Sequence, residues 1–186
     1  MPPELDQPSS LEPAATLYQP GRLDQEPTAP DTIRRVMAEV MEAMFFTEAE
    51  LTACEHAWLG RARCARIRFG GSHFGEMLLG VSAEAADPIA ASFLGLDPME
   101  LTDAQRGQVI QELSNILCGA ILSKLWPESK LALSSPKLSL WQEWPDAGAL
   151  HHCFAIPEGL LGISIRLTAA LDSPADDAPS APPLAA

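Results

Sequence analysis

The chain has 186 residues, 47% of them hydrophobic, which suits one domain of ordinary size with its own core. Its formal net charge of −13 at pH 7 argues against a nucleic-acid-binding protein, because phosphate backbones attract a basic surface. No run of roughly 18 apolar residues could span a membrane, and the first residues lack the basic and apolar regions of a signal peptide, so we expect a cytoplasmic protein.

The two ends of the chain differ in composition from its middle. Residues 1–30 are rich in proline and carry five acidic residues against one arginine, and 172–186 consist mostly of proline, alanine, aspartate and serine. Neither end can bury enough apolar surface to offset the entropy lost on ordering. We therefore expect two disordered acidic tails around one ordered domain at 31–171.

The ordered domain is expected to begin with a helix and a strand hairpin. Apolar residues at helical spacing predict a helix that is capped by Asp31 or Thr32 and ends near Phe46. Alternating apolar and polar residues then predict strands at 65–69 and 74–81. A glycine-containing turn separates the two, so they should pair as a hairpin.

Two further helices are expected after the hairpin. The first, at 82–95, contains Pro88, so either Asp87 caps a shorter helix or a longer helix kinks at the proline. The second is the longest of the chain. It opens with a Thr-x-x-Gln capping box at 102–105 and continues to about Trp126, where the following proline ends it.

The last third of the domain predicts strands. One lies at 131–141 and is interrupted by Pro136, which favours an edge position or a strand start. A hairpin at 149–156 and 161–168 follows. In its second strand, inward positions should alternate with outward ones, with Ile163, Ile165 and Leu167 inward and Ser164, Arg166 and Thr168 outward. The predicted class is therefore α+β, with a mainly antiparallel sheet of about five to six strands and helices on one face.

Metal and thiol chemistry find little support in the sequence. The four cysteines show no CxxC spacing, so they are expected to be reduced, mostly buried thiols; they are Cys54, Cys64, Cys118 and Cys153. The adjacent His151 and His152 should point to opposite faces of a strand, where they cannot easily share one metal ion. We predict no metal site.

A basic run stands out in this acidic chain. Its members are Arg61, Arg63, Arg66 and Arg68. Such a run is usually the solvated face of a strand, and the alternative is a docking surface for an acidic partner.

The long helix carries a polar cluster on one side. At about 100° per residue, Glu112, Asn115, Gln108 and Gly119 fall opposite the apolar residues. A solvated helix face would explain them. However, asparagine is a poor residue for an exposed helix interior, and a glycine there costs about 1 kcal/mol relative to alanine. A partner that contacts this face would explain both choices.

Residues 33–168 resemble the CheX-like members of the CheC/CheX/FliY family of chemotaxis phosphatases. The order of predicted elements is compatible with that fold. The resemblance is carried by 75–82 (GEMLLGVS), Ile89-Ala90, 93–95 (FLG), 112–119 (ELSNILCG) and Ser135-Pro136.

This resemblance implies a phosphatase that removes the phosphoryl group from the phosphoaspartate of a response-regulator receiver domain of the CheY type. Asn115 would orient the attacking water, and Glu112 would pair with the receiver's lysine. Gln108 and Gly119 would face the partner. The Mg²⁺ would belong to the receiver, so no cofactor is expected in this chain.

The sequence also departs from the family pattern. Gln108 stands where relatives often have aspartate or serine. The nearest match to a second motif on the first helix, at 39–42 (EVME), lacks the asparagine, so one active site is expected. The resemblance further implies a homodimer. A catalytically silent module that only binds a receiver or another signalling protein is the alternative.

Overall fold

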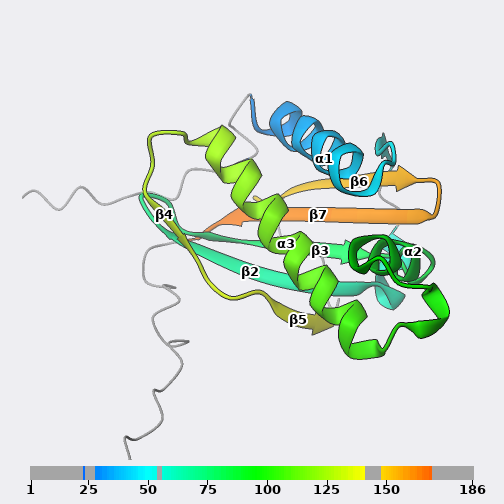
Figure 1. The fold of residues 1–186 in the computed structure, drawn as a ribbon. Helices are drawn as coiled ribbons and strands as arrows, with labels where there is room; N and C mark the ends of the chain where they lie inside the picture. The colour runs from blue at the N-terminus through cyan, green and yellow to red at the C-terminus, as the bar shows by residue number, and fades with distance from the viewer. Residues whose placement is uncertain (1–22, 24–27, 54–55, 141–147, 169–186) are drawn as a thin grey trace, which may run out of the picture.

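The computed structural model describes residues 23, 28–53, 56–140 and 148–168. Within them, seven strands form one antiparallel sheet, and three α-helices lie on one of its faces (Figure 1). The helices are α1 Ala29–Phe45, α2 Ala83–Leu94 and α3 Asp103–Leu125, with short 3-10 helices η2 His56–Arg61 and η3 Pro98–Glu100. The strands are β1 Glu50–Thr52, β2 Arg63–Gly71, β3 Gly75–Val81, β4 Leu131–Leu133, β5 Lys137–Leu140, β6 Leu150–Ile156 and β7 Gly159–Leu167. The predicted α+β class is confirmed.

The sheet has the order β1-β6-β7-β3-β2-β4, and β5 also pairs with β2. Both predicted hairpins, β2–β3 and β6–β7, are present and antiparallel. The sequence missed β1, which adds three residues to the edge of β6. It also merged β4 and β5, which Pro136 separates. The sheet therefore has seven strands rather than the predicted five to six.

Helix α1 begins earlier than the sequence predicted. Its N-cap is Thr28, which makes no side-chain capping bond, and Pro30 occupies the first turn, where its missing N–H is not needed. Neither Asp31 nor Thr32 is therefore the cap. Asp31 lies in the first turn, where its carboxylate is 3.1 Å from the guanidinium of Arg34. The predicted inward face is confirmed, with Ile33, Val36, Met37, Met41 and Phe45 buried. Leu23 is also buried in this core, whereas the rest of the predicted N-terminal tail up to residue 27, and all of 172–186, lie outside the described residues.

Helix α2 follows the longer of the two alternatives. Ser82 is its N-cap, and the backbone N–H of Ala85 donates to the Ser82 hydroxyl at 3.3 Å. Pro88 lies inside the helix, so Asp87 does not cap it. Instead, the Asp87 carboxylate accepts hydrogen bonds from the guanidinium of Arg106 on α3. This ion pair joins α2 to the first turns of α3.

Ser164 lies on the face of the sheet away from the helices, as predicted, but this face is partly buried. Ser164 is only 1% exposed, and its cross-strand neighbour Leu78 is buried as well. Cys64 and Cys153 are buried on the same face. The alternation of residues along each strand therefore predicts correctly on which face of the sheet a side chain lies. It does not reveal that side chains on this second face are also buried.

One cysteine differs from the expected reduced state. Cys64 and Cys118 are buried and do not form disulfide bonds, as predicted. Cys153 forms a disulfide bond, so the prediction was wrong for this residue. Cys54 lies outside the described residues. The scattered spacing of the cysteines gave no sign of a pairing, because residues distant in sequence meet only in the folded sheet.

Candidate functional site

Helix α3 crosses the helix-covered face of the sheet and carries the predicted site (Figure 1). Its capping box is confirmed. The N–H of Gln105 donates to the Thr102 hydroxyl at 3.3 Å, and the Gln105 side-chain oxygen accepts from the N–H of Thr102 at 2.8 Å. The helix ends at its C-cap, Trp126. Both termini are thus fixed by the residues that the sequence indicated.

The inner side of α3 holds it on the core. Its buried residues are Gly107, Val109, Ile110, Leu113, Ser114, Leu117, Cys118, Ile121 and Leu122. Because α3 cannot rotate about its axis without exposing this apolar surface, the side chains on its opposite side are held pointing away from the core. The helix is therefore a rigid support for polar groups that face outward.

The four predicted site residues lie away from this buried side. Gln108 and Glu112 are exposed, and Asn115 and Gly119 are half-buried. Within the described part of the chain, neither Glu112 nor Asn115 makes a side-chain hydrogen bond or ion pair. A carboxylate and an amide one turn apart are therefore both available to another molecule.

Gly119 has room for a larger residue within its own chain. A Cβ built there would lie 3.8 Å from Cδ1 of Leu133 on β4, which is an ordinary van der Waals contact. Packing inside this chain does not require glycine at position 119.

Gln111 is a site residue that the sequence reading did not select. Its side-chain amide donates a hydrogen bond of 2.6 Å to the carbonyl oxygen of Pro136, between β4 and β5. Gln111 precedes Asn115 by four residues, so the two are neighbours on one helix face. That spacing was visible in the sequence, but the acceptor, 25 residues further on, was not.

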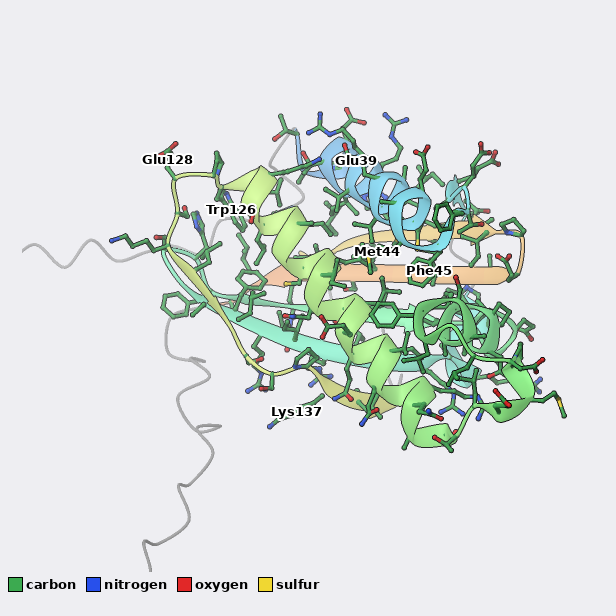
Figure 2. The ribbon with its side chains drawn as sticks, in the orientation of Figure 1. Glu39, Met44, Phe45, Trp126, Glu128 and Lys137 are labelled. Atoms are coloured by element: carbon green, nitrogen blue, oxygen red, sulfur yellow. The ribbon has the colours of Figure 1, made fainter. Side chains whose placement is uncertain are left out.

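The other flank of α3 is bounded by α1. Figure 2 shows Glu39 and Met44 on the α1 side of α3 and Trp126 at its C-terminal end. The Lys124 ammonium on α3 forms an ion pair with the Glu39 carboxylate. The polar face therefore lies between α1 on one side and the β4–β5 connection on the other.

Charged groups also fix the first turn of α3. The Arg63 guanidinium hydrogen-bonds to Asp103, and this bond holds the pKa of the Asp103 carboxyl below its usual range. Asp87 in turn raises the pKa of Arg106 through a hydrogen bond. Arg63 and Arg106 are therefore each paired with a carboxylate of the same chain.

The residues that the structure describes form no cluster of metal-binding side chains. No three His, Cys, Asp or Glu side chains lie close enough to hold an ion. His151 and His152 pair with Ser164 and Ile163 of β7, on alternate faces, as predicted. Over the same part of the chain, no helix is both long and apolar enough to cross a membrane.

The fold defines a class: an α+β protein with a curled antiparallel sheet and three helices, as in CheC-like and CheX-like proteins. Residues 63–142, which include Glu112 and Asn115, match the family profile described as chemotaxis phosphatase CheX. Over these residues the chain is similar to the CheX proteins that the profile describes.

Solved structures agree on the fold. A chemotaxis protein CheX from Desulfovibrio desulfuricans is 11% identical, with a TM-score of 0.61, and the match covers 75% of this chain and 99% of that one. CheX from Vibrio vulnificus is 15% identical, with a TM-score of 0.61 and coverage of 75% and 96%. A chain of the CheX–CheY–BeF₃–Mg²⁺ complex from Borrelia burgdorferi is 15% identical, with a TM-score of 0.57 and coverage of 75% and 97%. No curated protein matches this chain.

Proposed function

We propose that this protein hydrolyses the phosphoaspartate of a CheY-type receiver domain, and that Glu112 and Asn115 perform the two roles of the site. The observation that supports this most is that both side chains project from a rigid helix with no partner among the described residues. The family profile describes chemotaxis phosphatases, and the Borrelia relative was solved in complex with CheY, BeF₃ and Mg²⁺.

Asn115 would position the attacking water. An aspartyl phosphate is already activated, and its hydrolysis requires a water in line with the bond from phosphorus to the carboxylate oxygen. A side-chain amide both donates and accepts hydrogen bonds but does not act as a base. It can therefore orient water in the way that glutamines do in GTPases. Positioning of this kind can contribute rate factors of roughly 10² or more.

Glu112 would pair with the receiver's lysine and hold the complex in register. Its carboxylate is exposed and lies one turn before Asn115. Gln108 and Gly119 would contact the receiver at either end of this face. The receiver would bring the Mg²⁺, so the proposal assigns no metal ligand to this chain.

The test measures the dephosphorylation rate of phosphorylated receivers from the same organism, in Mg²⁺, with and without this protein. Asn115→Ala should abolish the acceleration and leave binding to a BeF₃-treated receiver largely intact. Glu112→Ala should weaken both. Ser123→Ala, at an exposed position two turns further along α3, is the matched control and should behave like the native protein. Full activity of Asn115→Ala would refute the role of this residue.

The alternative function is a module that binds a receiver without hydrolysing its phosphoaspartate. Gln108 favours it, because relatives often have aspartate or serine at this position. Binding of a BeF₃-treated receiver without acceleration of any phosphorylated receiver would establish this alternative.

We also propose, from the family, that the protein is a cytoplasmic homodimer. A sedimentation mass of one chain at micromolar concentration would contradict the dimer. Recovery of the protein from a cell fraction other than the cytosol would contradict the location.

A further inference from the structure

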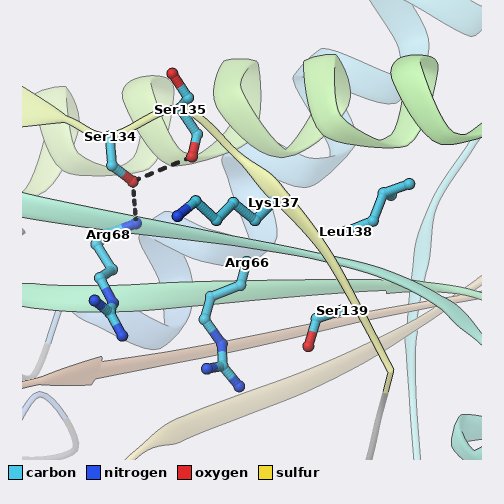
Figure 3. Close-up of a pocket in the computed structure, with 7 residues that line it drawn as sticks. All are labelled: Arg66, Arg68, Ser134, Ser135, Lys137, Leu138 and Ser139. Carbon is cyan, nitrogen blue, oxygen red and sulfur yellow. Dashed lines mark hydrogen bonds between the residues drawn. The ribbon is translucent and has the colours of Figure 1, made fainter. Parts of the chain in front are cut away.

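A pocket of about 270 Å³ lies on the face of the sheet away from the helices, where β5 and the residues before it pass β2 (Figure 3). Arg66 and Arg68 of β2 line it together with Lys137 of β5. Arg66 and Lys137 are directly paired across the two strands, so their side chains share a face. The intervening Ile67 is buried in the core. The sheet therefore separates this pocket from Glu112 and Asn115.

Among the described residues, positive charge exceeds negative charge around the pocket. Glu76 of β3 lies within ion-pair distance of both arginines, and its side chain is only 13% exposed. Arg166 of β7 hydrogen-bonds to it at 2.7 Å. Nε of Arg66 and Nε of Arg68 each lie 3.9 Å from the same carboxylate. One carboxylate thus faces three guanidinium groups.

The two pocket arginines keep their donors available. Their contacts to Glu76 are too long for hydrogen bonds, and in the described residues their guanidinium groups make no others. Their side chains are 44% and 46% exposed. The Arg68 backbone N–H, by contrast, is committed to the Ser134 hydroxyl at 3.0 Å, which fixes the serine-rich segment that forms the opposite wall.

We propose that this pocket binds a compact phosphate-type dianion, such as a phosphomonoester or a diphosphate group. The guanidinium forks of Arg66 and Arg68 match the oxygens of a phosphate, and Lys137 lines the same pocket. The volume lies just below that of usual small-molecule sites, which suits a headgroup rather than a large ligand. Because the chain as a whole carries a charge of −13, an extended polyanion would be repelled beyond the rim of the pocket.

The first experiment titrates the full chain with pyrophosphate by calorimetry at low ionic strength. We expect one site. Arg66→Gln combined with Arg68→Gln should weaken binding about tenfold or more, because both guanidinium groups would lose their charge-assisted hydrogen bonds to the phosphate oxygens. The matched control is Arg34→Gln with Arg35→Gln, which makes the same change of charge on exposed α1 residues and should not affect binding. Absence of binding, or an equal loss in the control, would overturn the proposal.

Two single variants keep the test independent of folding defects in the double variant. Lys137→Gln changes an exposed residue of β5 and should weaken pyrophosphate binding. Glu76→Gln removes the competing carboxylate and should strengthen it. If this cluster has only a structural role, Glu76→Gln should instead weaken pyrophosphate binding. Weaker binding in that variant would therefore count against the pocket.

The source of the phosphate group is distinguished by a second arm. Vesicles that contain phosphatidic acid are compared with neutral vesicles in a sedimentation assay. Vesicle binding that requires Arg66 and Arg68 would identify a lipid headgroup. Pyrophosphate binding without vesicle binding would identify a free phosphate compound. Neither arm requires phosphatase activity, so failure of the proposed function would leave the result unaffected.

Discussion

The side-chain amide of Gln111 donates a 2.6 Å hydrogen bond to the carbonyl oxygen of Pro136. This bond fastens the connection between β4 and β5 to α3, one turn before Asn115. It links the residue that we propose to orient water with a part of the chain that has no regular backbone pairing of its own.

Gln111→Ala should destabilise the protein by about 1–2 kcal/mol, because the partly buried carbonyl of Pro136 loses its partner. Urea denaturation measures the change. Gln108→Ala is the control, since Gln108 is exposed on the same helix, and its effect should stay within about 0.5 kcal/mol. Equal stabilities of the two variants would mean that the bond contributes nothing.

Gly119→Ala should stabilise the protein by up to about 1 kcal/mol, because alanine has a higher helix propensity and the added methyl meets Leu133 at 3.8 Å. The same variant should bind a receiver more weakly if a partner approaches position 119 closely. Thermal unfolding and receiver binding are measured on one preparation. A stabilised variant with unchanged binding would remove Gly119 from the proposed interface.

Gly75→Ala should be destabilising, in contrast to Gly119→Ala. A Cβ at Gly75 would lie 2.3 Å from the carbonyl oxygen of Arg166 and 2.5 Å from Cζ of Phe69. Overpacking of this kind costs about 3 kcal/mol. The free energy of unfolding by urea tests this, and a loss below about 1 kcal/mol would show that the β3–β7 pair can shift to accept a methyl group.

Cys118 should be unreactive in the native protein. Burial raises the pKa of its thiol to about 12, so almost none is present as the nucleophilic thiolate at pH 8. Iodoacetamide should label it only after denaturation, as read by mass spectrometry of the peptide that contains it. Rapid labelling of the native protein would show that this part of α3 opens to solvent.

His152 should make the protein less stable in acid. Burial lowers its pKa below the ordinary value of 6.5, so the unfolded chain binds the proton more readily than the folded one. The stability linked to neutral His152 is therefore complete above pH 6.5 and is lost as pH falls below it. His152→Asn should show a smaller loss of unfolding free energy between pH 8 and pH 5 than the native protein. An identical loss would contradict this assignment.

The sequence predicted those parts of the fold that local chemistry determines. The capping box at Thr102 and the alternation in β2 and β3 each depend on residues that are close in the chain. Three features could not be predicted, because they depend on contacts between residues that are distant in the chain. They are the short strand β1, which pairs with β6, the burial of Ser164, and the disulfide bond of Cys153.

The candidate site, like the fold, could be predicted only in part from the sequence. The common outward direction of Glu112 and Asn115 follows from helix periodicity and could be predicted. The role of Gln111 could not, because Pro136 reaches it only through the sheet. The excess of positive charge at Arg66 and Arg68 was visible as a basic run, but the single carboxylate shared with Arg166 was not.

The break between β4 and β5 also affects how this protein behaves when it is concentrated. An exposed sheet edge can recruit strands from other molecules and so initiate aggregation. In the described part of the chain, the edge beside β2 consists of a three-residue strand and a four-residue strand, and Pro136 between them has no N–H to donate. An incoming strand could form only a short, interrupted ladder at this edge. Pro136, whose carbonyl oxygen accepts the hydrogen bond from Gln111, therefore also limits strand pairing at this edge and so opposes fibril growth.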